Sequence, residues 1–141
     1  DQINPSIASL PGDEFVAIWS DRAGNDGELG GIFGRIYTSA FEPVSPEFLV
    51  NTLTTGWQSL SNVASAVNGN FMAIWTEANG HVEGQVFGAD GTKLGAQFTV
   101  YNVGTRNSDV AVDSDGNFWV VGVFHYDGKG YISKYSNSGE L

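Results

Sequence analysis

The sequence contains no cysteine, few basic residues and no long apolar run. Its 141 residues include six lysines and arginines against sixteen acidic residues, which gives a net charge of −10. Without cysteine, disulfide scaffolds, thiol catalysis and cysteine-based zinc sites are excluded. The few scattered cations argue against nucleic acid as a partner, because phosphate backbones bind clustered positive charge. No stretch approaches the roughly 18 apolar residues of a membrane span, so we expect no membrane insertion.

What the sequence does contain is typical of one folded domain with many turns. Hydrophobic residues make up 41% of the chain, which supports a core, and the 19 glycines indicate frequent turns. The length suits a single domain. The acidic, cysteine-free composition is compatible with secretion, and we expect an extracellular or cell-surface protein.

An internal repeat organises the chain. Four sequence blocks recur in the same order, three of them in three copies and the last in two. The matching segments are 6–10, 62–66 and 109–112; 15–19, 71–75 and 118–121; 34–37, 84–87 and 132–135; and 47–50 with 97–100. They predict one repeat domain over 1–141, with repeat 1 at about 1–56, repeat 2 at about 57–103 and an incomplete repeat 3 at about 104–141.

Each block has the composition of a β-strand. The blocks are rich in Val, Ile, Phe, Tyr and Trp and are bounded by Gly, Asn, Asp or Pro. The first hairpin of each unit closes through 11–13, 68–70 or 115–117, where glycine with Asn or Asp supplies the positive φ of a tight turn. No window shows sustained helical periodicity. The chain is therefore predicted to be all-β.

The second strand of each unit is apolar on both faces, as in 15–19. A strand buried on both sides within a four-stranded unit is typical of a β-propeller blade between neighbouring blades. We therefore predict β-propeller-type repeats, with three four-stranded blades of which the third is incomplete. A β-sandwich is the alternative.

The third unit ends where its fourth strand is expected, because 138–141 aligns with the turn that leads into that strand in repeat 2. Three blades fall short of the four to eight that close a propeller, and an open sheet edge invites pairing. We expect self-association or flanking repeats to complete the structure. Two copies would make a six-bladed ring, and a longer polypeptide would supply further blades itself.

Segments 4–10, 15–19, 34–37 and 47–52 resemble tandem repeats of very large secreted or surface bacterial proteins. Segment 109–120 is similar to the repeats of bacterial NHL-type β-propellers. This resemblance implies a propeller-type fold and an extracellular binding or structural role. It supplies no catalytic residues.

Two glycine-containing turns carry the oxygen-bearing side chains that calcium prefers. The candidate ligands are Asp21, Asn25, Asp26 and Glu28 in the first turn, and Asp113 and Asp115 in the second. Neither turn follows the spacing of an EF-hand, and Asp and Asn also stabilise turns by local hydrogen bonds. Calcium is the one cofactor that the sequence suggests.

Trp57 and Gln58 are candidates for binding a glycan. They lie in the connection between the first two units, where loops often carry function, and the positions equivalent to Trp57 are Asp1 and Gly104. The alternative is that Trp57 caps the core or contacts a partner chain. Trp19 and Trp75 recur at one strand position, so we expect both in the core.

We predict a non-enzymatic extracellular binding or assembly module whose incomplete blade is completed by another chain or copy. His81 and His125 lie at turns, and no nucleophile, histidine and acid form a distinctive pattern. The alternatives are a carbohydrate-binding propeller lectin, with glycans as partners, and a fragment of a larger surface adhesin.

Overall fold

The computed structural model describes residues 1–24, 27, 29–102 and 104–138. These residues form eleven strands in three antiparallel sheets, in each of which consecutive strands are neighbours. Sheet 1 contains β1 (Gln2–Leu10), β2 (Glu14–Asp21), β3 (Gly31–Thr38) and β4 (Phe48–Leu49). Sheet 2 contains β5 (Gln58–Ser65), β6 (Phe71–Glu77), β7 (Val82–Phe87) and β8 (Lys93–Tyr101). Sheet 3 contains β9 (Thr105–Val112), β10 (Phe118–Phe124) and β11 (Gly130–Tyr135).

The all-β prediction is confirmed. Among the described residues sheet 3 has three strands, and no counterpart of β4 or β8 lies beside β11. No helix in this part of the chain is long and apolar enough to cross a membrane.

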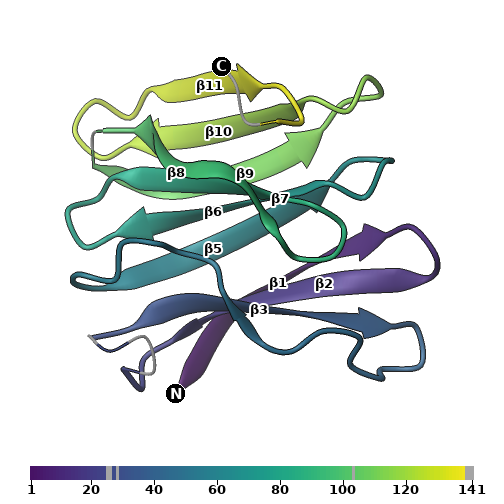
Figure 1. Ribbon diagram of the computed structural model, residues 1–141. Coiled ribbons are helices and arrows are strands. Elements are labelled where there is room, and N and C mark those ends of the chain that lie inside the picture. Colours follow the sequence, from purple (N-terminus) through teal and green to yellow (C-terminus); the bar gives the residue numbers. More distant parts are fainter. Residues whose placement is uncertain (25–26, 28, 103, 139–141) are drawn as a thin grey trace.

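The three sheets are stacked face to face with sheet 2 in the middle (Figure 1). One hydrophobic cluster fills the space between sheets 1 and 2, and a second fills the space between sheets 2 and 3. Because successive side chains of a strand point to opposite faces, β6 contributes to both clusters. Phe71 and Trp75 belong to the first cluster, Met72 and Ile74 to the second, and all four are fully buried.

The first strands of the sheets, β1, β5 and β9, lie next to one another. Hydrogen bonds join them from sheet to sheet. The Val63 N–H donates to Ser6 Oγ at 3.2 Å, and Asn62 Nδ2 donates to the carbonyl oxygen of Ser108 at 2.8 Å. The Ser65 hydroxyl donates to the carbonyl oxygen of Ser9. Neighbouring sheets are therefore fixed together along this inner edge by polar contacts as well as by their cores.

At the outer edge, a phenylalanine from the fourth strand packs against a glycine in the third. A Cβ at Gly34 would lie 2.8 Å from a ring carbon of Phe48, and a Cβ at Gly84 would lie 3.1 Å from the ring of Phe98. Both contacts require the absence of a side chain on the third strand. In sheet 3 the equivalent position is Ile132. It pairs with Val121 of β10, just as Gly34 pairs with Ile18 of β2 and Gly84 pairs with Ile74 of β6.

This packing makes Gly34 sensitive to a single added methyl group. We expect Gly34→Ala to destabilise the protein by about 1–3 kcal/mol, because the Phe48 ring must move out of a filled core. Gly130→Ala is the matched control, since a Cβ there meets no atom within 4 Å, and its effect should stay within about 0.5 kcal/mol. Chemical denaturation of the two variants measures the difference. Equal stability of both variants would contradict the packing described.

Candidate functional site

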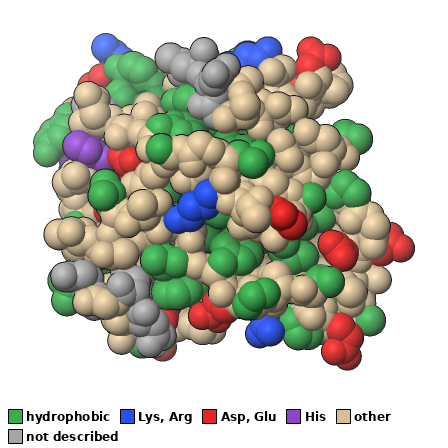
Figure 2. Space-filling view, viewed as in Figure 1, with side chains coloured by type: hydrophobic (Ala, Val, Ile, Leu, Met, Phe, Trp, Pro, Cys, Tyr) green, Lys and Arg blue, Asp and Glu red, His purple; other side chains and the backbone are tan. Residues whose placement is uncertain are grey.

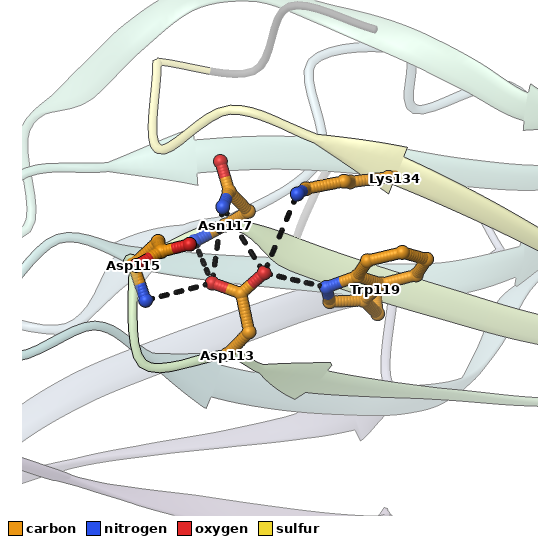
Figure 3. A network of polar contacts seen from close by, with 5 residues as sticks. All are labelled: Asp113, Asp115, Asn117, Trp119 and Lys134. Carbon is orange, nitrogen blue, oxygen red and sulfur yellow. Dashed lines mark hydrogen bonds and ion pairs between the residues drawn. The ribbon is translucent and has the colours of Figure 1, made fainter.

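The turn between β9 and β10 is organised by the carboxylate of Asp113 (Figure 3). Its Oδ1 accepts the backbone N–H groups of Asp115 at 3.0 Å and of Asn117 at 2.9 Å. Its Oδ2 accepts the indole N–H of Trp119 at 2.8 Å and lies 3.5 Å from Lys134 Nζ. The Lys134 ammonium also lies 5.0 Å from the ring centroid of Trp119. The two predicted calcium ligands thus meet here, but Asp115 enters the network through its backbone.

Hydrogen bonds from the Trp119 indole, and from the Asn117 backbone and amide, lower the pKa of Asp113 below its ordinary value of 3.8. Both oxygens of the charged Asp113 carboxylate thus accept hydrogen bonds from the protein itself. Across the described part of the chain, no three His, Cys, Asp or Glu side chains form a group that could hold a metal ion. Calcium binding by Asp113 and Asp115 stays a prediction.

The other predicted calcium turn begins at Asp21, which is buried. Its Oδ1 accepts the N–H of Ala23 at 2.9 Å and lies 3.6 Å from the ammonium group of Asp1. The remaining candidates, Asn25, Asp26 and Glu28, lie outside the described residues. Calcium binding at this turn likewise stays a prediction.

The structure places the two predicted glycan-binding residues differently. Trp57 is 42% exposed, and the guanidinium of Arg22 lies 5.5 Å from its ring centroid. Gln58 is 2% exposed. Its Nε2 donates to Glu77 Oε2 at 3.0 Å, and its Oε1 accepts from Asn51 Nδ2 at 3.4 Å. Trp57 is therefore accessible to a ligand, whereas the amide of Gln58 is engaged inside the protein.

The outer face of sheet 1 is an apolar surface whose residues the sequence analysis did not single out as a site. We call it face A and define it by Phe15, Trp19, Tyr37 and Phe41, which line a hollow of about 400 Å³. The Phe15 and Tyr37 rings stack at 5.5 Å. The indole Nε1 of Trp19 is buried and has no hydrogen-bond partner among the described residues.

Face A repeats the surface that sheet 2 buries against sheet 1. The registers of β2 with β3 and of β6 with β7 make its residues equivalent to fully buried residues of sheet 2. The equivalent pairs are Phe15 with Phe71, Ala17 with Ala73, Trp19 with Trp75 and Tyr37 with Phe87. The expectation that Trp75 lies in the core is confirmed. Trp19, also expected in the core, is only partly buried, because none of the three sheets of the described chain covers it.

The outer face of sheet 3 is the second uncovered surface. We call it face B and define it by Ala111, Trp119, Val121 and Ile132, which line a hollow of about 160 Å³. Ile132 is 66% exposed. Val121 is equivalent to Ile18 and Ile74, which are buried between sheets. The stack therefore ends on a largely apolar face at each end, and on face B Asp109 borders the hollow and Lys134 lies over the ring of Trp119.

A polar cleft of about 170 Å³ lies along the first strands and takes side chains from β1, β5 and β9. Asn4, Ser61, Asn62, Asn107 and Ser108 line it, and its lining includes no charged side chain. The Ser108 hydroxyl is buried without a hydrogen-bond partner within the described ranges. Amides and hydroxyls both donate and accept, so this surface suits neutral polar groups. On the side of the molecule shown in Figure 2, charged side chains are spread out and form no patch of one sign.

No family model matches this chain, and no curated protein matches its sequence. The resemblance to NHL-type repeats therefore has no family or sequence match behind it. The fold occurs in several solved structures, including the two that follow. Hadza microbial sialidase Hz136 matches with a TM-score of 0.65 and 12% identity over 99% of this chain and 36% of that chain. The α-L-arabinofuranosidase from Lactobacillus brevis matches with a TM-score of 0.61 and 9% identity over 99% of this chain and 55% of that chain.

These likenesses concern the fold alone. The chain spans about a third of one solved structure and about half of the other. An arrangement like that of the three sheets therefore also occurs as part of larger chains.

The network around Asp113 predicts a pH-dependent contribution to stability. Because the pKa of Asp113 is lowered in the folded state, the contribution is complete above its ordinary value of 3.8 and is lost as the pH falls below it. Asp113→Asn should therefore lower the melting temperature at neutral pH, and the gap from the wild type should shrink as the pH falls below 3.8. Asp115→Asn serves as the control. A gap that does not change with pH would contradict this role.

Proposed function

We propose that the chain is a non-enzymatic extracellular assembly module. In this proposal its three sheets are consecutive blades of a β-propeller-type structure, and further blades cover faces A and B. The observation that carries it is that face A exposes the residue pattern that sheet 2 buries.

The energetic argument follows from apolar burial. Covering a large apolar side chain contributes about 1.5–3 kcal/mol, and each outer face carries several such side chains. Contiguous exposed apolar surface of this kind marks an interaction site more often than a free surface. Within the chain, a surface like face B packs on a surface like face A twice, once on each side of sheet 2. The same contact between separate molecules would continue the stack.

The solved structures with this fold support the proposal, because three sheets account for only part of each of those chains. Three blades also fall below the four to eight that close a propeller. The further blades come from a second copy or, as in a larger surface adhesin, from the same polypeptide. Either source covers the same two faces.

The first test is the mass of the chain in solution. We expect the wild type to associate at micromolar concentration, and Val121→Glu to weaken this association because it places a charge on face B. Val67→Glu is the matched control, since Val67 is also exposed but lies at the tip of the hairpin between β5 and β6. Sedimentation velocity measures all three proteins. Equal association by the two variants would contradict the role of face B.

Carbohydrate binding is the second candidate function. The polar cleft favours it, because its neutral amides and hydroxyls match the hydroxyl groups of a sugar. The names of the two solved structures described above denote proteins that act on carbohydrate, although a shared fold does not carry function with it. Trp57 offers an exposed ring at a separate place.

A glycan array tests this second function with three proteins. If the cleft binds sugar, Asn107→Ala should lose the signal of the wild type while Trp57→Ala keeps it. The reverse result would place the site at Trp57. No signal from the wild type would remove the candidate.

A further inference from the structure

The inference concerns the outer edge of sheet 3 and rests on the proposed assembly function. In sheets 1 and 2 the fourth strand places a phenylalanine over the third strand, where the ring fills the outer part of a core. The ring of Phe48 lies 5.7 Å from that of Phe87, and the ring of Phe98 lies 5.0 Å from that of Tyr135. Among the described residues no strand supplies such a ring to face B, where Ile132 is exposed.

Phe41 stands at the position that Gly91 occupies in sheet 2. Both residues belong to the turn after the third strand, and both turns have the same hydrogen bonds. The Phe41 N–H donates to the carbonyl of Thr38 at 2.9 Å, and the Gly91 N–H donates to the carbonyl of Gly88 at 2.9 Å. Both residues have positive φ, 64° for Phe41 and 83° for Gly91. The equivalence therefore rests on backbone geometry.

Gly91 contacts the preceding sheet. A Cβ on it would lie 3.1 Å from the ring of Phe48, so the glycine makes room for that ring. Between sheets 1 and 2, the preceding sheet thus contributes the large side chain and the following sheet contributes the glycine.

Phe41 itself has two unfavourable features. Its backbone is in the left-handed region, which a bulky residue rarely adopts. Its side chain is 78% exposed, with the ring 6.0 Å from Phe15 in an edge-on contact. The exposure is what is expected of a residue whose main contact is with another molecule.

We propose that Phe41 packs on sheet 3 of a second copy, in the place that Phe48 and Phe98 take on sheets 1 and 2. Face B of one copy then covers face A of the other, head to tail. Between sheets 1 and 2 the preceding sheet contributes the large side chain, whereas in the proposed contact the following sheet does. The following sheet contributes Phe41, and within the described residues the preceding sheet has no fourth-strand ring at this place. Ile132 is the side chain that the Phe41 ring contacts.

The inner edge of the same contact has a hydrogen-bonding residue in place. Asp109 pairs with Val121 of β10. Ser6 and Asn62 have the same register position relative to β2 and β6. Ser6 and Asn62 both make hydrogen bonds to the next inner strand. By the same geometry Asp109 accepts the N–H of Ile7 in the second copy, because Ile7 is the residue of β1 equivalent to Val63.

The occupant is a second copy because both halves of the contact are present on this chain. A head-to-tail contact leaves one complementary face free on each molecule, and a closed ring of two copies uses all four faces. Two copies bring six sheets together, which lies within the range of closed propellers.

The absence of cysteine makes cross-linking a sharp test. Phe41→Cys and Ile132→Cys are prepared as separate proteins and mixed under oxidising conditions. We expect a disulfide-linked dimer in the mixture and none from either protein alone, as seen by intact mass. Val67→Cys mixed with Ile132→Cys is the control and should give no link. Linkage of Phe41→Cys to itself would overturn the head-to-tail arrangement.

A second measurement uses the unmodified interface. Phe41→Gly should raise the dissociation constant of the dimer at least about tenfold through lost apolar contact, without lowering the melting temperature of the monomer. Tyr126→Ala removes another exposed aromatic side chain, outside both faces, and should change neither. A wild-type dimer that neither cross-links in the mixture nor responds to Phe41→Gly would overturn this inference and leave the assembly function standing. A monomeric wild type would overturn the second-copy contact and the self-association expected of the assembly function.

Discussion

The burial of sheet 2 on both sides is the constraint on which the rest of the structure depends. Phe71 and Trp75 of β6 need cover on one face, and Met72 and Ile74 need it on the other. One neighbouring sheet satisfies each face. Because the neighbours are built from the same repeat, each carries a second apolar face of its own, with no further sheet in the described chain to cover it. Faces A and B are therefore consequences of the repeat rather than isolated patches.

Much of the fold could be predicted from the sequence, because the repeat, the turn glycines and the strand composition all act locally. The site residues could not, because their roles depend on what converges from elsewhere. The sequence predicts Asp113 as a calcium ligand from its turn alone, but the donors to its carboxylate include Trp119 from β10 and Lys134 from β11. Gln58 follows Trp57 directly in the chain, yet it begins β5 and is buried while Trp57 stays accessible. Trp19 matches Trp75 in sequence, but no sheet of the described chain covers it, and its indole N–H lacks the partner that Glu77 gives to Trp75.

The third repeat departs from the first two mainly where it faces outward. Ile132 replaces the glycines of β3 and β7, and Lys134 stands where Ile36 and Val86 are buried. The inward positions Phe118 and Val120 remain apolar and fully buried. Since an inward change would disturb the core shared with sheet 2, the end of the stack is the place where the repeat can change. The likeness to parts of two larger solved structures concerns the fold of this stack of sheets.

The close approach of β1, β5 and β9 also determines how such a stack can grow. The sheets come nearest to one another along these strands, where side-chain hydrogen bonds bridge them. Because the sheets are closer together along this edge than along the opposite edge, each sheet is rotated relative to the one before it. Every further sheet would be rotated in the same direction. In the proposed assembly, repetition of the same contact would therefore bend the stack toward a closed ring rather than extend it in a straight line.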